Sequence, residues 1–266
     1  MNKSAIEWCT HTNPDAYSCL HGCPFCYAIK IIKRFPMNFI GINQTFDRML
    51  DLNPLVSDES VTEIAIKPHL NIKALYAPAD MKKPAIVFRG SMTDLFGAWW
   101  PWEFPYDLMR AMYEVPHHKY VILTKNPERM HNTLKHFNPG HFDHVYFGTS
   151  VDGGISGVGR LAHLSLIHDL GFKTVISFEP LLEDPKKLVG AIRGGTSWAD
   201  WIIIGGQTNP TKIPEPEWIH TIFDSAVWDC QVQKPVFCKS NIGNGYESVR
   251  QFPADLLPIA QSWGKA

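Results

Sequence analysis

The sequence predicts an α/β fold, a partial (β/α)6 TIM-like barrel with parallel strands. Short apolar runs rich in β-branched and aromatic residues recur along the 266 residues, and each run ends in polar residues. A helical pattern follows most runs, at spacings of roughly 25 to 35 residues, as expected for repeated βα units. The runs are apolar at consecutive positions, which is typical of parallel strands buried on both faces. These observations favour a parallel sheet that is closed or partly closed as a barrel.

Seven runs are interpreted as strands, at about residues 6–9, 86–88, 120–123, 144–148, 174–178, 201–206 and 235–238. An open doubly wound sheet is the alternative arrangement, although no glycine-rich dinucleotide-binding pattern follows the first strand. In barrels of βα units the chemistry lies at the carboxyl ends of the strands. Taken singly, each polar residue there is most simply part of a loop. These ends carry Ser91, Thr93, Asp94, Lys125, Thr149, Ser150, Asp152, Ser177, Glu179, Gln207, Thr208, Lys239 and Ser240.

Three helices are predicted from capping residues and apolar faces. Asn126 precedes Pro127, which suits the first helical position, and this helix is expected to run to about Phe137. A second helix has one apolar face and is expected to stop before Gly171. A third has a similar face near the carboxyl end of the chain. The two apolar faces consist of Leu161, Leu164, Ile167, Trp218, Ile219, Ile222 and Phe223.

Composition restricts the class of protein. With 45% hydrophobic and 12% aromatic residues the chain can bury a core and is not disordered. Lys and Arg total 25 against 26 Asp and Glu, and this balance argues against a general polyelectrolyte binder. No apolar run approaches the ~18 residues that cross a bilayer, so we expect a cytoplasmic protein without a membrane partner. One domain over 1–266 is expected, with the proline-containing residues 38–83 as an insertion or lid.

A cysteine cluster is the most specific motif. Cys19, Cys23 and Cys26 are separated by three and then two residues. Three thiolates on one loop can hold three corners of an iron–sulfur cube and leave one iron open to another ligand. A zinc site with His21 or His11 and a closed electron-transfer cluster are the alternatives. The remaining cysteines, Cys9, Cys230 and Cys238, are expected to pack as small apolar residues or to supply a fourth ligand.

The cysteine spacing, with Phe25 before the third cysteine and Tyr27 after it, resembles the signature of the radical S-adenosylmethionine (SAM) superfamily. More widely, the chain resembles a phage-associated, radical-SAM-like family of largely undefined function. The matching segments are IEWCTHTNPDAYSCLHGCPFCYA, FRGSMTDLF, LTKNPERM, GTSVDGG, SFEPLL, WIIIGGQT and PVFCKS. The resemblance implies about six βα units, a 4Fe–4S cluster on the three cysteines and SAM on the open iron. It also implies reductive cleavage of SAM to a 5′-deoxyadenosyl radical and an external electron donor such as a flavodoxin or ferredoxin.

The resemblance also implies a set of SAM-binding positions. Phe25 would lie near the adenine, mainly through its backbone, and Tyr27 is a further cofactor-binding position. Ser150 would meet the ribose or the carboxylate. The superfamily usually has a Gly-Gly-Glu-like segment for the SAM amino group, where this chain has Arg-Gly-Ser-Met-Thr-Asp. The candidate ligands of the SAM amino group are therefore Ser91, Thr93 and Asp94. The other implied positions are Gly90, Arg160 for the carboxylate, and Gly205, Gly206 and Gln207 near adenine.

Lys125, Glu179 and Lys239 follow three different strands and are candidate catalytic residues that would converge on a substrate. The alternative is that they neutralise one another. The Trp-Trp-Pro-Trp stretch at 99–102 is expected to plug the hydrophobic wall, with base stacking as the alternative, and His117 and His118 are expected at the surface. The substrate is unidentified, a nucleotide or nucleic acid being one class. The alternative function is a metal-stabilised (Fe–S or zinc) nucleic-acid or protein-binding module without SAM chemistry.

Overall fold

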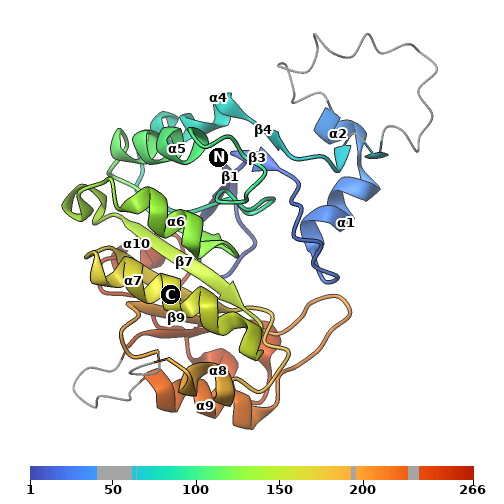
Figure 1. The fold of residues 1–266 in the computed structure, drawn as a ribbon, viewed down its shortest axis with the longest axis vertical. Helices are drawn as coiled ribbons and strands as arrows, with labels where there is room; N and C mark the ends of the chain where they lie inside the picture. The colour runs from blue at the N-terminus through green and yellow to red at the C-terminus, as the bar shows by residue number, and fades with distance from the viewer. Residues whose placement is uncertain (41–61, 64, 193–195, 227–233) are drawn as a thin grey trace.

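The fold is built on one largely parallel sheet (Figure 1). The computed structural model describes residues 1–40, 62–63, 65–192, 196–226 and 234–266. Within these residues the main sheet has eight strands in the order β1-β2-β5-β6-β7-β8-β9-β10. Only the edge strand β1 runs antiparallel to its neighbour. The strands are β1 (Asn2–Lys3), β2 (His11–Asn13), β5 (Ile86–Arg89), β6 (Lys119–Thr124), β7 (Val145–Val151), β8 (Lys173–Phe178), β9 (Trp201–Ile204) and β10 (Val236–Cys238).

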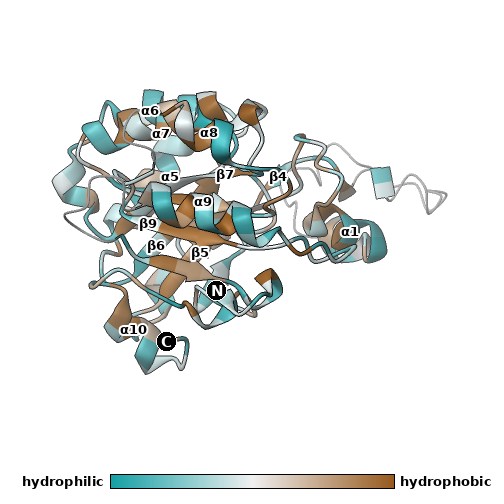
Figure 2. Ribbon diagram, turned by 90° about the horizontal axis from the view of Figure 1, so that it is seen from below, coloured by the Kyte–Doolittle hydropathy of each residue, from teal (hydrophilic) through white to brown (hydrophobic). Residues whose placement is uncertain are grey.

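Helices cover both faces of this sheet. Figure 2 shows the brown strands between α6, α7 and α8 on one side and α10 on the other. None of the described helices is long and apolar enough to cross a membrane. The helices are α1 (Tyr27–Arg34), α2 (Met37–Ile40), α4 (Ile72–Leu75), α5 (Phe104–Tyr113), α6 (Pro127–Leu134), α7 (Val158–Asp169), α8 (Lys186–Gly190), α9 (Pro216–Ala226) and α10 (Leu257–Ser262).

Residues alternate between two cores along each strand, which is why the strands are apolar at consecutive positions. In β6, Ile122 belongs to the core shared with α5–α9, whereas its neighbour Val121 faces the opposite core. In β9, Ile202 and Ile203 divide in the same way. The second core, which we call the inner core, includes the N-terminal Trp8 and part of α10. The core shared with α5–α9 is called the helix-side core. The prediction of strands buried on both faces is confirmed.

The sheet is curved around Trp8. The Trp8 ring centroid lies 4.8 Å from that of Phe88 in β5 and 6.0 Å from that of Trp201 in β9. In a flat sheet these two strands, four neighbours apart, would be separated by about 19 Å. The sheet therefore wraps its inner face around this indole. The end strands β1 and β10 do not pair with each other in the described residues, so no closed barrel forms.

Most predicted elements are present, but the first strand was placed wrongly. Residues 6–9 form no strand; β2 lies at His11–Asn13, where Thr12 pairs with Phe88 of β5. Trp8 and Cys9 are apolar because they fill the inner core, and this burial gives the same pattern as a strand. The three predicted helices are α6, α7 and α9, although α6 ends at Leu134 rather than near residue 137.

The expected insertion or lid at 38–83 is described only in part, since residues 41–61 and 64 lie outside the described residues. The rest contains the end of α2, then β4 (His69–Leu70) and α4. Strand β4 pairs antiparallel with β3 (Ala16–Tyr17), the short strand that precedes the cysteines. This pairing fixes the chain just before the cysteine loop, which we define as residues 18–26.

Asp255 ties the amino ends of the strands to the segment before α10. Its carboxylate accepts hydrogen bonds from Lys119 Nζ (2.8 Å), Lys173 Nζ (2.8 Å) and the Tyr146 hydroxyl (2.6 Å). Burial acts to raise the pKa of Asp255, but these hydrogen bonds outweigh it and lower the pKa from 3.8 to about 2. The folded state therefore gains stability from the ionised carboxylate above about pH 4, and loses it as the pH falls toward 2.

We expect Asp255→Asn to lower the free energy of unfolding at pH 7 by about 2 kcal/mol, since one pKa unit corresponds to about 1.4 kcal/mol. The variant should also lose less stability than the wild type between about pH 5 and pH 2.5. Urea unfolding followed by circular dichroism at several pH values measures both effects. Equal acid sensitivity of the two proteins would exclude Asp255 as the source of this pH dependence.

Candidate functional site

A cavity of about 860 Å³ lies at the carboxyl ends of β5 to β10. Because these strands are parallel, their last residues meet along one edge of the sheet. Phe88, Leu123 and Trp8 belong to the inner core or pack against it, and they form an apolar part of the cavity wall. The cysteine loop and α1 line it as well. The strand-end residues that face the cavity include Gly90, Ser91, Thr93, Asp94, Lys125, Ser150, Ser177, Glu179, Gln207 and Lys239.

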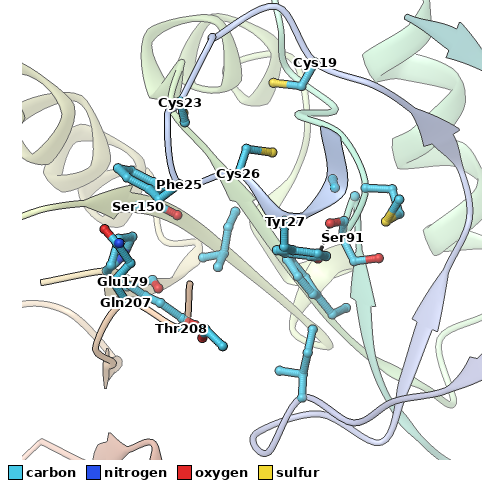
Figure 3. A pocket seen from close by; sticks show the side chains of 18 of the residues that line it. Cys19, Cys23, Phe25, Cys26, Tyr27, Ser91, Ser150, Glu179, Gln207 and Thr208 are labelled. Atoms are coloured by element: carbon cyan, nitrogen blue, oxygen red, sulfur yellow. Dashed lines mark hydrogen bonds between the residues drawn. The ribbon is translucent and has the colours of Figure 1, made fainter. Parts of the chain in front are cut away.

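The cysteine loop connects β3 to α1, so the cluster follows a strand of the small sheet. Cys19, Cys23 and Cys26 are all partly exposed and all line the cavity (Figure 3). Cys26 occupies the N-cap position of α1, and its backbone N–H donates to the Cys23 carbonyl (3.1 Å). Burial raises the pKa of Cys19 to about 12, and nearby Asp94, Cys23 and Cys26 act in the same direction. The three predicted metal ligands therefore share one wall of one cavity.

The thiols do not form a preassembled metal site. In the part of the chain that the structure describes, no group of three or more His, Cys, Asp or Glu side chains is arranged to hold a metal ion. Gly22, between the first two cysteines, has a φ of +66°, and no heavy atom lies within 4 Å of the position a Cβ would take there. The space beside Gly22 itself is therefore open. The thiol donors fit an iron–sulfur cluster in kind and number, and the loop has room to gather them.

Asp94 anchors the cysteine loop to the sheet. Its carboxylate accepts from His21 Nε2 (2.7 Å), Thr124 Oγ1 (2.7 Å), the Lys125 N–H (2.8 Å) and the Phe96 N–H (3.0 Å). These four donors come from the loop, from β6 and the residue after it, and from the turn after β5. Asp94 was a candidate ligand for the SAM amino group, but here its oxygens are fully used by the protein. We assign it a positioning role.

The neighbouring candidates are also engaged with the loop. The Thr93 hydroxyl donates to the Ser18 carbonyl at the start of the loop, and the Tyr27 hydroxyl donates to the Ser91 carbonyl. These contacts join the start of the cysteine loop and the first residue of α1 to the turn after β5. Phe25 and Tyr27 line the cavity beside the cysteines, as Figure 3 shows.

Two of the three candidate catalytic residues pair with each other. Lys239 Nζ donates to Glu179 Oε1, and the side chains are 14% and 26% exposed. Lys125 also faces the cavity, but its ammonium has no hydrogen-bond or ion-pair partner among the described residues. Gly205 makes room for the pair, since a Cβ there would lie 3.0 Å from Lys239 Cδ and 3.2 Å from Glu179 Cγ. Gly205 itself does not line the cavity, contrary to its expected place near adenine.

Two further candidates have partners within the protein. Arg160 was expected to meet a SAM carboxylate, but it does not line the cavity, and its Nη1 donates to the Ser150 carbonyl (2.5 Å). Gln207 lines the cavity, yet its Nε2 donates to the Pro210 carbonyl (2.8 Å) within its own loop. Arg160 therefore fixes the end of β7, where Ser150 remains available to a ligand.

Ser177 was named only as a strand-end residue and not among the SAM-binding or catalytic candidates, yet it faces the site. It lies in β8 in register with Ser150 of β7, and both line the cavity. Ser177 is 1% exposed, and its hydroxyl has no hydrogen-bond partner in the described part of the chain. A buried hydroxyl without a partner is costly, so a ligand that hydrogen-bonds to it would be stabilised. Its place near the end of a predicted strand was the only available signal in the sequence.

The predictions for the Trp stretch, for His118 and for the remaining cysteines have different outcomes. Trp100 is buried in the helix-side core and Trp99 packs against it, as expected for a plug, whereas Trp102 is 72% exposed. His118 is fully buried, with Nε2 hydrogen-bonded to the Pro78 carbonyl (2.9 Å), so its surface placement is wrong because η1 (Ala77–Asp80) covers it. Cys9 and Cys238 are buried as expected, and burial raises the pKa of each to about 12. Cys230 lies outside the described residues.

Comparison with known proteins places the chain in a group without an assigned function. A family model described as "Protein of unknown function (DUF5131)" matches residues 3–247. No curated protein and no solved structure matches the chain.

Proposed function

The chain belongs to the DUF5131 family of proteins of unknown function, and we propose from its own site that it is a radical SAM enzyme acting on an unidentified substrate. The observation that carries this proposal is the position of the cysteine loop. Its three thiols line the same cavity as the carboxyl ends of β5 to β10, where enzymes built of βα units carry their chemistry. We interpret the curved, largely parallel sheet as a partial barrel.

In this proposal Cys19, Cys23 and Cys26 hold a 4Fe–4S cluster. The bound cluster with SAM supplies one-electron reductive chemistry, driven by an external donor such as a flavodoxin or ferredoxin. Asp94 and His21 position the loop through their 2.7 Å hydrogen bond. The aligned hydroxyls of Ser150 and Ser177 supply hydrogen bonds to the polar part of SAM. The apolar wall at Phe88 and Leu123 excludes water from the reaction, which protects reactive species.

Anaerobic reconstitution tests the proposal. The chain should take up about four irons and four sulfides, and dithionite should then drive release of 5′-deoxyadenosine from SAM. Metal analysis and chromatography of the products measure the two results. A chain that binds zinc alone, or that holds the cluster and never cleaves SAM, would overturn the proposal and favour a metal-stabilised binding module.

A further inference from the structure

The acidic side chains of the cavity wall already have donors within the protein. Glu7 accepts from the Ser240 N–H (3.0 Å) and from Arg250 Nη2 (2.5 Å). Asp94 has its four donors, and Glu179 is paired with Lys239. Of the acidic groups described in the wall, Glu7 and Glu179 are thus paired with cations, and the oxygens of Asp94 are occupied by other donors.

Three cations of the same wall have no acidic partner among the described residues. Lys125 projects from the end of β6, and Lys30 and Arg34 lie on α1. Lys30 Nζ donates only to a backbone oxygen, the Asn209 carbonyl (3.0 Å), and the Arg34 guanidinium lies 5.2 Å from the Phe35 ring centroid. A chain of net charge −1 thus places three cations without a direct acidic partner in the wall of one cavity. This arrangement favours an anionic ligand.

The same face of α1 and the residue after it carries exposed apolar side chains. Tyr27, Ile31 and Phe35 recur every four positions, are 49%, 40% and 48% exposed, and line the cavity with Lys30 and Arg34. Lys33, on the same helix, is exposed but does not line the cavity. No Asp or Glu occurs between Asp15 and Asp47. The helix therefore presents both cations and aromatic rings to whatever enters.

We propose that this wall binds a nucleotide unit of the substrate, with Lys30, Arg34 and Lys125 around the phosphate and Phe35 stacked on the base. A phosphate ester carries the charge that several cations can share, and every base offers a face to an aromatic ring. An aliphatic acid would use the cations and leave the rings exposed. The inference rests on the proposed function for the reaction, but nucleotide binding itself can be measured without any turnover.

The probe is a single strand of about ten thymidylates that carries fluorescein at its 5′ end. Its binding to the cluster-free and to the reconstituted chain is measured by fluorescence anisotropy. Lys30→Glu and Arg34→Glu should each weaken binding roughly tenfold, and Lys33→Glu less than about twofold, although all three change the charge of one helix equally. Phe35→Ala should weaken binding about fivefold or more, whereas Trp102→Ala, which removes an exposed aromatic outside the cavity, should not. Arg34→Gln and a circular dichroism melt separate lost binding from lost folding.

Competition identifies the form of the nucleotide. Displacement of the strand by thymidine monophosphate but not by thymidine supports a free nucleotide, and displacement only by unlabelled strand supports a nucleotide within a chain. Equal competition by thymidine, an equal effect of Lys33→Glu, or absence of binding would overturn the inference. A chain that cleaves SAM and binds no nucleotide fails only this inference. A chain that binds the strand through Lys30 and Arg34 but never cleaves SAM fails only the proposed function.

Discussion

Asp15→Ala is expected to lower the free energy of unfolding by about 3–5 kcal/mol, because it leaves a buried guanidinium without its counter-charge. The Asp15 and Arg89 side chains are both fully buried. Asp15 accepts from Arg89 Nε (3.1 Å) and from Asn13 Nδ2 (2.6 Å), in addition to its contact with Arg89 Nη2. Arg89 Nη1 already has no hydrogen-bond partner among the described residues, and no second carboxylate is paired with Arg89 there to replace the one that is lost.

The effect should extend to the segment that covers this pair. Arg89 Nη2 donates to the Leu75 carbonyl (3.0 Å), and Asn13 Nδ2 donates to the Ala74 carbonyl (2.8 Å). Both carbonyls belong to α4, so the charged group also holds α4 against the ends of β2 and β5. Urea unfolding measures the loss in stability, and hydrogen exchange should show α4 opening first.

Two control variants make this prediction specific. Asp15→Leu combined with Arg89→Met should recover most of the lost stability, since it removes both charges and retains the volume. Arg110→Ala breaks an exposed pair with Glu114, whose side chains are 72% and 44% exposed, and should cost less than about 0.5 kcal/mol. A loss below about 1 kcal/mol for Asp15→Ala would mean that water reaches the guanidinium.

Local pattern was sufficient for most of the fold. The six later strands were predictable because neighbouring residues such as Ile202 and Ile203 enter different cores, which requires apolar residues at both positions. The start of helix α6 was predictable because a capping residue sets it. The Asn126 side chain accepts a hydrogen bond from the Arg129 N–H (3.3 Å). The end of α7 was predictable because Gly171 adopts a φ of +94°, a conformation that favours glycine.

The candidate site was less predictable because its contacts are non-local. Whether Asp94 faces a ligand or the protein depends on His21 and Thr124, which lie 73 and 30 residues away. The contact of Arg160 with the Ser150 carbonyl could not be predicted, because a backbone group leaves no trace in the residue pattern. The places of Lys30 and Arg34 in the cavity wall could not be predicted from strand ends, because both residues lie on the helix α1.

Cys23→Ala is expected to abolish cluster assembly and SAM cleavage while the cluster-free chain stays folded. Iron and sulfide should fall from about four of each per chain to near zero, and 5′-deoxyadenosine by at least about a hundredfold. Folding should persist because Cys23 is only partly buried and its contact within the loop, the carbonyl that accepts from the Cys26 N–H, is a backbone group. Metal analysis, product chromatography and a thermal melt of the cluster-free protein give the three readouts.

Cys238→Ala is the matched control, because it removes a thiol that is fully buried among apolar residues of the helix-side core. It should cost about 1 kcal/mol in stability through the small cavity it leaves, and change neither iron content nor SAM cleavage. Iron loss in this variant would identify a fourth protein ligand and leave no open iron for SAM. Unfolding of cluster-free Cys23→Ala, with no SAM cleavage by the wild type, would instead assign the cysteine loop a purely structural role. The two variants together therefore separate an open catalytic cluster from a closed cluster and from a metal staple.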